Sequence, residues 1–205
     1  MNEIILVGGF EEIIELAEEC GKRIYGIIDK ANKTIENYLI LGTEKDVDIF
    51  DKTIKNKPLI ITPDTPKVRK KLHFFYKENG FVFSQLLSKR AMISESARIE
   101  EGTVVQRGVN ISTDVCIGVF VKLNVNCNVM HNTVIGDYTT IAPNAVILGN
   151  VNIGDCCYMG ANSTVLPNIK ICNDVVIGAG AVVTKDINES GTYVGIPAKL
   201  INLTK

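Results

Sequence analysis

The sequence predicts two domains: a small α/β domain with a parallel sheet, followed by a parallel β-helix. Two observations support this fold class. Residues 1–88 alternate short apolar runs with helical spacings, whereas residues 89–205 place an aliphatic residue at every sixth position. Charge follows the same division, because residues 1–92 hold 15 of the 22 Lys and Arg and 14 of the 23 Asp and Glu. The residue pattern of the chain changes near Ser88, and we place the domain boundary there.

The first domain is expected to alternate strands with helices. Apolar residues at positions 13, 14, 16, 17 and 20 have a helical spacing, and Gly21 after them is a typical C-terminal cap. Thr65-Pro66 begins a second helix, because proline is tolerated in a first turn. The pattern predicts helices over 11–20 and 66–79, and strands over 3–7, 23–28, 59–62 and 81–83. This order indicates a small, Rossmann-like parallel sheet.

A ligand site is expected at one edge of this sheet. In open α/β sheets, ligands usually bind at the carboxyl ends of the strands. Those ends carry Gly8 and Gly9 after the first strand, and Asp29 followed by Lys30 after the second. We therefore expect these four residues to bind the substrate.

The second domain is a six-residue repeat without insertions. Sixteen positions in steps of six, from Ile93 to Val183, are all aliphatic. Three positions after each of them, twelve of the sixteen residues are Asn, Gly or Asp, which tolerate a left-handed backbone. A corner every six residues bends the chain by about a third of a turn, so three repeats close one triangular coil. Stacked about 4.8 Å apart, the repeats make roughly five coils.

A few residues depart from these patterns. Phe120 and Tyr138 occupy corner positions where Asn or Gly is typical, and we expect their side chains to be exposed. The helix over 66–79 carries a group of basic residues and a histidine: Lys67, Arg69, Lys70, Lys71 and His73. We expect this group to face the solvent, as charged side chains usually do.

The composition excludes several classes of protein. The net charge of −1 argues against a nucleic-acid surface or a basic membrane patch. The apolar run from Ile4 to Phe10 is too short to span a bilayer, so we expect a cytoplasmic protein without membrane insertion. Six cysteines form no CxxC pair and only two histidines are present, so no metal site is expected.

Several motifs occur together over nearly the whole chain: Gly26-Ile27-Ile28-Asp29, the stretch 123–136, Ile177-Gly178-Ala179-Gly180 and Gly195-Ile196-Pro197-Ala198-Lys199. In this combination the chain resembles the NeuD/PglD-like family of bacterial sugar O- and N-acetyltransferases. The resemblance implies a left-handed β-helix and a homotrimer. It also implies that acetyl-CoA lies in a groove between neighbouring prisms, and that the acceptor sugar binds between the N-terminal domain and the coils.

By this resemblance, His131 is the general base. The family's base lies in a motif of the type His-(Asp/Glu)-x-x-Ile-Gly, which the chain matches from His131 to Gly136. An imidazole suits this step, because the acceptor loses a proton as it attacks the thioester. Gly149 follows eighteen residues later, one coil above, and is implied as the N–H donor to the oxyanion. Asn132 stands where the family has a carboxylate, and it cannot stabilise an imidazolium as a carboxylate does.

The resemblance also implies the remaining site residues. Asn124 matches an active-site asparagine that would hold the acceptor or the imidazole. The backbones expected to bind acetyl-CoA are those of Thr140, Gly149, Ala161 and Ala179. The family's glycine loop, Gly-x-Gly-Gly-His, is shortened here to Gly8-Gly9-Phe10-Glu11 and lacks the histidine, which leaves the identity of the sugar open.

Three functions follow from this resemblance and its departures. The first is an acetyl-CoA-dependent acetyltransferase that acts on an amino group of a nucleotide-activated sugar in surface glycan biosynthesis. The second is a sugar O-acetyltransferase that acts on a hydroxyl group, as on sialic acid. The third is a catalytically inactive trimeric scaffold that binds sugar, which Asn132 and the missing loop histidine would favour.

Overall fold

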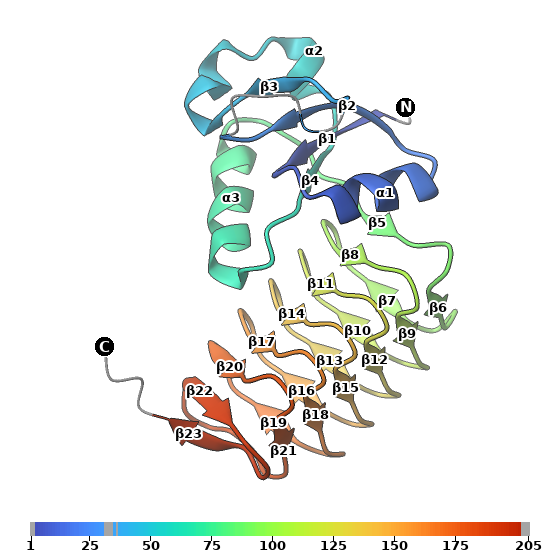
Figure 1. Ribbon diagram of the computed structural model, residues 1–205, viewed down its shortest axis with the longest axis vertical. Helices are drawn as coiled ribbons and strands as arrows, with labels where there is room; N and C mark the ends of the chain where they lie inside the picture. Colours follow the sequence, from blue (N-terminus) through green and yellow to red (C-terminus); the bar gives the residue numbers. More distant parts are fainter. Residues whose placement is uncertain (1–2, 31–34, 36, 202–205) are drawn as a thin grey trace.

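The chain folds as an α/β domain at one end of a long prism of short strands (Figure 1). The computed structural model describes residues 3–30, 35 and 37–201. The predicted fold class, an α/β domain followed by a parallel β-helix, is confirmed. The last four residues of the second predicted domain, 202–205, lie outside the described residues.

Four parallel strands form the sheet of the first domain, in the order β3-β2-β1-β4. They are β1 (Glu3–Val7), β2 (Arg23–Ile28), β3 (Ile40–Gly42) and β4 (Leu59–Ile61). Three of them match predicted strands, and the structure adds β3. The strand predicted over 81–83 is wrong, because Phe83 makes only an isolated bridge with Leu59.

Helices cover both faces of this sheet. Ile4 and Leu6 pack in the cluster that contains α1 (Glu11–Glu19), whereas Ile5 and Val7 pack on the side of α3 (Pro66–Glu78). The alternation follows from the strand, whose successive side chains point to opposite faces. The 3₁₀ helix η1 (Glu44–Ile49) and α2 (Lys52–Lys55) connect β3 to β4. No described helix is both long enough and apolar enough to cross a membrane.

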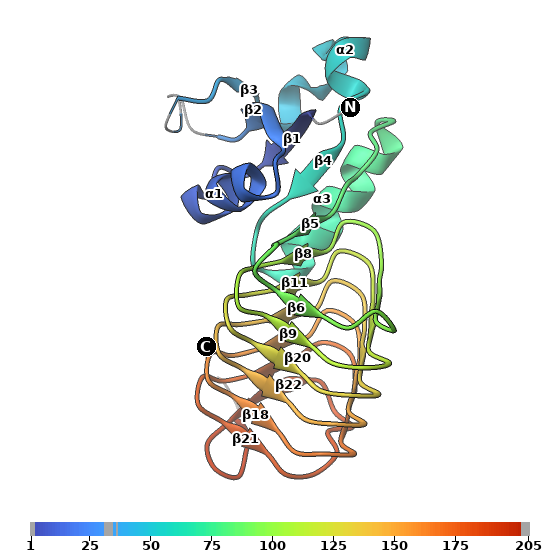
Figure 2. The same ribbon diagram turned by 90° about the vertical axis from the view of Figure 1, so that its right-hand side faces the viewer.

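The second domain is a triangular prism in which successive coils stack in parallel (Figure 2). Face 1 contains β5, β8, β11, β14, β17, β20, β22 and β23, face 2 contains β6, β9, β12, β15, β18 and β21, and face 3 contains β7, β10, β13, β16 and β19. Their bounds are β5 (Leu86–Leu87), β6 (Met92–Ile93), β7 (Arg98–Ile99), β8 (Val104–Val105), β9 (Asn110–Ile111), β10 (Cys116–Ile117), β11 (Lys122–Leu123), β12 (Asn128–Val129), β13 (Val134–Ile135), β14 (Thr140–Ile141), β15 (Val146–Ile147), β16 (Asn152–Ile153), β17 (Tyr158–Met159), β18 (Thr164–Val165), β19 (Lys170–Ile171), β20 (Val175–Ile177), β21 (Val182–Val183), β22 (Gly191–Val194) and β23 (Lys199–Ile201).

The register of the prism follows the predicted repeat. Val129 pairs with Ile111 in the coil below and with Ile147 in the coil above, each eighteen residues away. These aliphatic residues are buried in one continuous core, and the residue before each of them points outward. The three corners are named after the faces that they join. In the coil of β11 to β13, corner 1/2 spans 124–127, corner 2/3 spans 130–133, and corner 3/1 is the next turn, 136–139.

The corners have the left-handed backbone that the repeat predicts. Positive φ angles recur every six residues from Gly102 to Gly180. Only three of these corner residues are not Gly, Asn or Asp: Phe120, Tyr138 and Cys156. They are eighteen residues apart, so they form one column on corner 3/1. A left-handed backbone costs such residues roughly 1–2 kcal/mol each, and a compensating contact is expected at this column.

That contact is α3, which packs against corner 3/1. Phe120 and Tyr138 are buried, so the expectation that they are exposed is wrong. His73, also expected at the surface, is buried with its ring stacked on Phe120 at 4.0 Å between centroids. Its Nδ1 lies 2.8 Å from the Tyr138 hydroxyl. The aromatic side chains at this corner therefore bury the inner face of a helix that comes from the other domain.

Arg69 is the second correction on α3, because its guanidinium is buried and not exposed. It donates hydrogen bonds to the carbonyl oxygens of Pro63, Asp64, Phe120, Tyr138 and Thr139 and to the hydroxyl of Thr140. Burial lowers the pKa of Arg69 to about 10, so the group is still protonated at neutral pH. One side chain thus ties the loop before α3 to two coils of the prism.

Candidate active site

The His131 side chain projects from corner 2/3, just after β12. It is exposed, whereas Val129, two residues earlier, points into the core. The ring Nδ1 lies 3.0 Å from Oδ1 of Asn132, whose φ is +58°. When Nδ1 donates its proton to this amide oxygen, Nε2 keeps its lone pair and faces away from Asn132. In this arrangement Nε2 is the ring nitrogen that remains open to a ligand.

Gly149 lies against the free side of this imidazole. A Cβ atom on Gly149 would come within 2.6 Å of both Nε2 and Cε1 of His131. The two coils are held together at this point by a 2.9 Å hydrogen bond from the Asn150 amide to the His131 carbonyl. The structure thus brings His131, Asn132 and Gly149 together, and the close approach requires glycine at position 149.

Asn124 lies on a different corner of the same protomer. It follows β11 at corner 1/2, is buried, and directs Nδ2 toward Oδ1 of Asp64 at 3.4 Å. Because corner 1/2 and corner 2/3 are opposite edges of face 2, Asn124 and His131 do not meet within one protomer.

The residues predicted to bind CoA lie at three places, one of which is Gly149 at corner 2/3 beside His131. Ala161 and Ala179 are stacked on corner 1/2, where the Gly180 amide donates a 2.9 Å hydrogen bond to the Ala161 carbonyl. Thr140 is buried on face 1, where its hydroxyl donates to the Asp64 carbonyl at 2.7 Å and accepts from Arg69. The structure therefore separates Thr140 from the two alanines.

The residues predicted to bind the substrate surround a cavity at the carboxyl edge of the first sheet. The cavity holds about 230 Å³, and Gly8, Asp29 and Lys30 line it together with Phe10 and Pro63. Gly9 contributes indirectly: its amide donates a 2.9 Å hydrogen bond to Oδ2 of Asp29, which lines the cavity. Gly8 has a φ of +95°, and a Cβ there would lie 2.5 Å from the Thr62 hydroxyl. Gly8 is thus required by the shape of this edge.

The sequence patterns did not indicate a polar contact between the domains. Lys122, on β11, is buried, and its Nζ lies 2.9 Å from Oδ1 of Asp64 and 3.0 Å from the carbonyl oxygen of Thr62. Burial, followed by the charge of Asp64, raises the pKa of Tyr158 two coils further along face 1. Lysine at an outward strand position normally faces water, so no sequence signal indicated that this face is covered.

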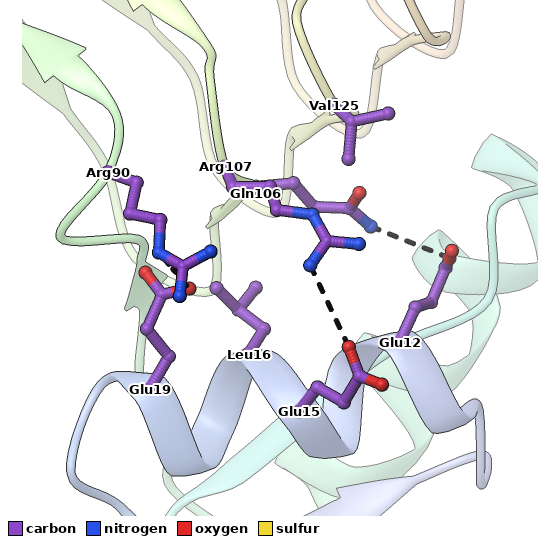
Figure 3. Close-up of a pocket in the computed structure, with 8 residues that line it drawn as sticks. All are labelled: Glu12, Glu15, Leu16, Glu19, Arg90, Gln106, Arg107 and Val125. Carbon is purple, nitrogen blue, oxygen red and sulfur yellow. Dashed lines mark hydrogen bonds and ion pairs between the residues drawn. The ribbon is translucent and has the colours of Figure 1, made fainter.

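A second cavity, of about 130 Å³, lies between α1 and corner 1/2. Figure 3 shows the glutamates of α1 directed toward the coils: Glu12 toward Gln106, Glu15 toward Arg107, and Glu19 toward Arg90. The two ion pairs are long, at 3.8 Å and 3.6 Å. Among the described residues, no group of three or more His, Cys, Asp or Glu side chains is arranged to hold a metal ion.

Comparison with known proteins supports this description of the fold. Residues 150–185 match the family model described as bacterial transferase hexapeptide (six repeats). A search among curated proteins gives no match.

Several solved structures are similar over nearly the full length. A histidine-to-alanine mutant of GDP-perosamine N-acetyltransferase from Caulobacter crescentus, in complex with CoA and GDP-perosamine, is 25% identical, covers 98% of each chain and has a TM-score of 0.93. WeeI from Acinetobacter baumannii is 26% identical, over 97% of this chain and 100% of that one, with a TM-score of 0.87. The acetyltransferase domain of PglB from Neisseria gonorrhoeae, 22% identical over 98% and 100%, shares the fold with a TM-score of 0.90. With its left-handed hexapeptide-repeat β-helix and this full-length likeness, the chain has the fold and domain order of the NeuD/PglD-like sugar acetyltransferases.

Proposed function

We propose that the protein is an acetyl-CoA-dependent acetyltransferase that acts on an amino group of a nucleotide-activated sugar, as part of bacterial surface glycan biosynthesis. The observation that carries the proposal is the pairing of His131 with Gly149 on the outside of the prism. It is supported by the full-length similarity to an enzyme solved with CoA and GDP-perosamine. That enzyme is described as an N-acetyltransferase, which favours an amine as the acceptor group.

His131 acts as the general base. Its Nε2 accepts a proton from the acceptor amine while the nitrogen attacks the thioester carbonyl. The tetrahedral intermediate then collapses, the C–S bond breaks, and the CoA thiolate leaves and takes up a proton. Products are the N-acetylated sugar and free CoA. General-base catalysis of this kind typically contributes about 10²–10⁴-fold in rate.

Gly149 is the proposed oxyanion donor. Its backbone lies beside Nε2 of His131, and among the described residues no acceptor takes a hydrogen bond from its amide. An N–H group held in place before the reaction stabilises the developing charge without reorganising. Asn132 orients the imidazole through Nδ1, but unlike a carboxylate it adds no negative charge to stabilise the imidazolium.

A trimer would assemble the site from two protomers. The outward residues of face 2 carry no charge: Met92, Asn110, Asn128, Val146, Thr164 and Val182. Face 3 presents Arg98 and Lys170 instead, and the α/β domain covers part of face 1. Face 2 is therefore the best candidate for the contact around a three-fold axis.

Such a contact brings together the two corners that border face 2. Corner 2/3 of one protomer, with His131, would lie beside corner 1/2 of the next, with Asn124, Ala161 and Ala179. Acetyl-CoA would run along the backbones of these alanines, with Thr140 behind them on face 1, and Asn124 would hold the acceptor. The acceptor's nucleotide would occupy the cavity at Gly8 and Asp29.

The test is to incubate the protein with acetyl-CoA and a panel of nucleotide amino sugars, GDP-perosamine among them, and to follow free thiol. Sialic acids are tested in parallel as acceptors, and the binding of CoA is measured separately. Release with an amino sugar supports the proposal. Release with sialic acids alone would assign O-acetylation instead. A protein that binds no CoA would be the inactive scaffold. The cytoplasmic location stays a prediction.

A further inference from the structure

Lys122 is a charged side chain that is buried where the two domains meet. Its side chain is 2% exposed, and its ammonium is satisfied by Oδ1 of Asp64 and by the carbonyl oxygen of Thr62. A charge can be buried only where a partner compensates for the lost water. Two apolar residues could join the domains at the same place without that cost. The pair therefore has a use beyond holding the domains together, and that use should lie with its accessible member, Asp64.

Asp64 is held rigidly and is still accessible. Its Oδ1 forms an ion pair with Nζ of Lys122 and accepts a hydrogen bond from Nδ2 of Asn124 at 3.4 Å. The Asp64 carbonyl oxygen accepts hydrogen bonds from Arg69 and Thr140. Nevertheless the side chain is 48% exposed, and among the described residues no donor bonds to Oδ2. One oxygen fixes the carboxylate, and the other is presented to the solvent.

The position of Asp64 joins the substrate cavity of the first domain to the prism. Asp64 follows β4 at the same sheet edge as Gly8, and its neighbour Pro63 lines the cavity there. Phe10 lines the same cavity, and its ring centroid lies 5.7 Å from Nζ of Lys122. A ligand that leaves this cavity toward the coils therefore meets Asp64.

A second carboxylate lies beside the same edge of the prism. Gln106 is stacked one coil below Asn124, is also buried, and directs its amide toward Glu12 at 3.5 Å. Figure 3 shows this contact beside Val125, at corner 1/2. Two buried amides thus face two carboxylates of the α/β domain. Corner 1/2 is the edge that would meet the partner subunit's His131 in the proposed trimer.

We propose that Asp64 is an acceptor-binding residue whose Oδ2 accepts hydrogen bonds from the ring hydroxyl groups of the nucleotide-activated amino sugar, and that Lys122 is the positioning residue that aims it. This proposal rests on the proposed function and names a specificity determinant of the same site. The carboxylate would select sugars that keep a hydroxyl donor at the matching ring position. Asp64 would not bind the reacting amine, which His131 deprotonates. A carboxylate beside that amine would stabilise its protonated form and so oppose the loss of the proton.

The test compares Asp64→Ala, Asp64→Asn and Lys122→Met with a matched control, Asp174→Asn. Asp174 also forms an ion pair between the domains, with Lys67 at 3.0 Å, but it lies at corner 3/1. Steady-state kinetics are measured with acetyl-CoA and with the panel acceptor that the wild type uses best, and the binding of CoA and the thermal stability are measured alongside.

We expect Asp64→Ala to raise the KM for the acceptor by roughly 10- to 100-fold, the size typical of a lost hydrogen bond to a charged group. Binding of CoA should be unchanged. Asp64→Asn keeps an acceptor oxygen, so its KM for the acceptor should rise less than that of Asp64→Ala. Lys122→Met should also raise this KM by a smaller factor. Asp174→Asn should leave it unchanged.

Two results would overturn the assignment of Asp64 while leaving the proposed function intact. One is an unchanged KM for the acceptor in Asp64→Ala. The other is an equal loss in Asp174→Asn, which would show that any broken contact between the domains has this effect. A wild-type protein that acetylates no panel acceptor would instead contradict the proposed function, and with it this proposal.

Discussion

Nδ1 of His73 and the hydroxyl of Tyr138 lie 2.8 Å apart and join α3 to corner 3/1 of the prism. Both side chains are buried, and the Nε2 atom of His73 has no hydrogen-bond partner among the described residues. Burial raises the pKa of Tyr138 to about 12, so the phenol stays protonated and neutral at this contact. A neutral imidazole suits this site, and an imidazolium would not.

Acid should therefore weaken the protein through His73. Burial, and next the charge of Lys77, lower the pKa of His73, while Asp137 opposes them. The unfolded chain then binds this proton more readily than the folded chain, so the stability from His73 is present above an unfolded pKa of about 6.5 and falls as the pH drops below it. We would measure the free energy of unfolding by denaturant at several pH values between 7.5 and 5. As the pH falls, it should decrease more steeply for the wild type than for His73→Phe. Parallel curves would contradict this account.

Gly102 and Gly180 offer a matched pair of corner substitutions. Their φ angles are +72° and +68°, so alanine meets the same backbone strain, roughly 1–2 kcal/mol, at each. A Cβ on Gly180 meets nothing within 4 Å, whereas one on Gly102 would lie 2.4 Å from the ring of Phe120. We expect Gly102→Ala to lower the free energy of unfolding by about 1–3 kcal/mol more than Gly180→Ala. Equal losses would mean that the Phe120 ring moves freely.

Arg69→Met should be strongly destabilising. The substitution leaves the carbonyl oxygens of Phe120, Tyr138 and Pro63 without this donor. Each buried acceptor left unsatisfied costs about 1–3 kcal/mol, so we expect a total loss of about 3 kcal/mol or more. Lys67→Met on the same helix breaks only an exposed ion pair and should cost less than about 1 kcal/mol. Thermal unfolding of the two variants compares them directly. If both variants lose the same small amount of stability, the guanidinium of Arg69 does not hold the domains together.

Gly149→Ala should impair catalysis with the prism intact. Its φ lies outside the left-handed region, so the added Cβ acts only through the imidazole of His131, at 2.6 Å. A displacement of a catalytic group by about 1 Å can cost roughly 100-fold, so we expect a fall of that order in kcat with CoA binding preserved. The double variant with His131→Ala removes the clash and should be no less stable than His131→Ala alone. Unchanged kcat in Gly149→Ala would contradict the close approach.

Much of the prism could be predicted because its rule is local. An aliphatic residue and a left-handed corner recur every six positions, and the eighteen-residue spacing by itself places Gly149 above His131. The burial of Phe120 and His73 could not be predicted in this way. Each depends on a contact between segments about fifty residues apart, which neither the repeat nor the helical spacing contains.

The same limit applies to the candidate site. Gly8 and Asp29 could be assigned to one edge because parallel strands end together. Lys122 stands at an outward position of the repeat, and only the folded chain shows that the α/β domain covers that position. The family resemblance groups Thr140 with Ala161, whereas the fold places the two on different parts of the coil.

The central claim is that His131 removes the proton from an amino sugar during acetyl transfer. The most direct test is the rate of thiol release from acetyl-CoA with a nucleotide amino sugar, for the wild type and for His131→Ala, with CoA binding measured on both. We expect the variant to bind CoA normally and to lose about 10²–10⁴-fold in kcat. A variant that transfers acetyl groups as fast as the wild type would contradict the claim.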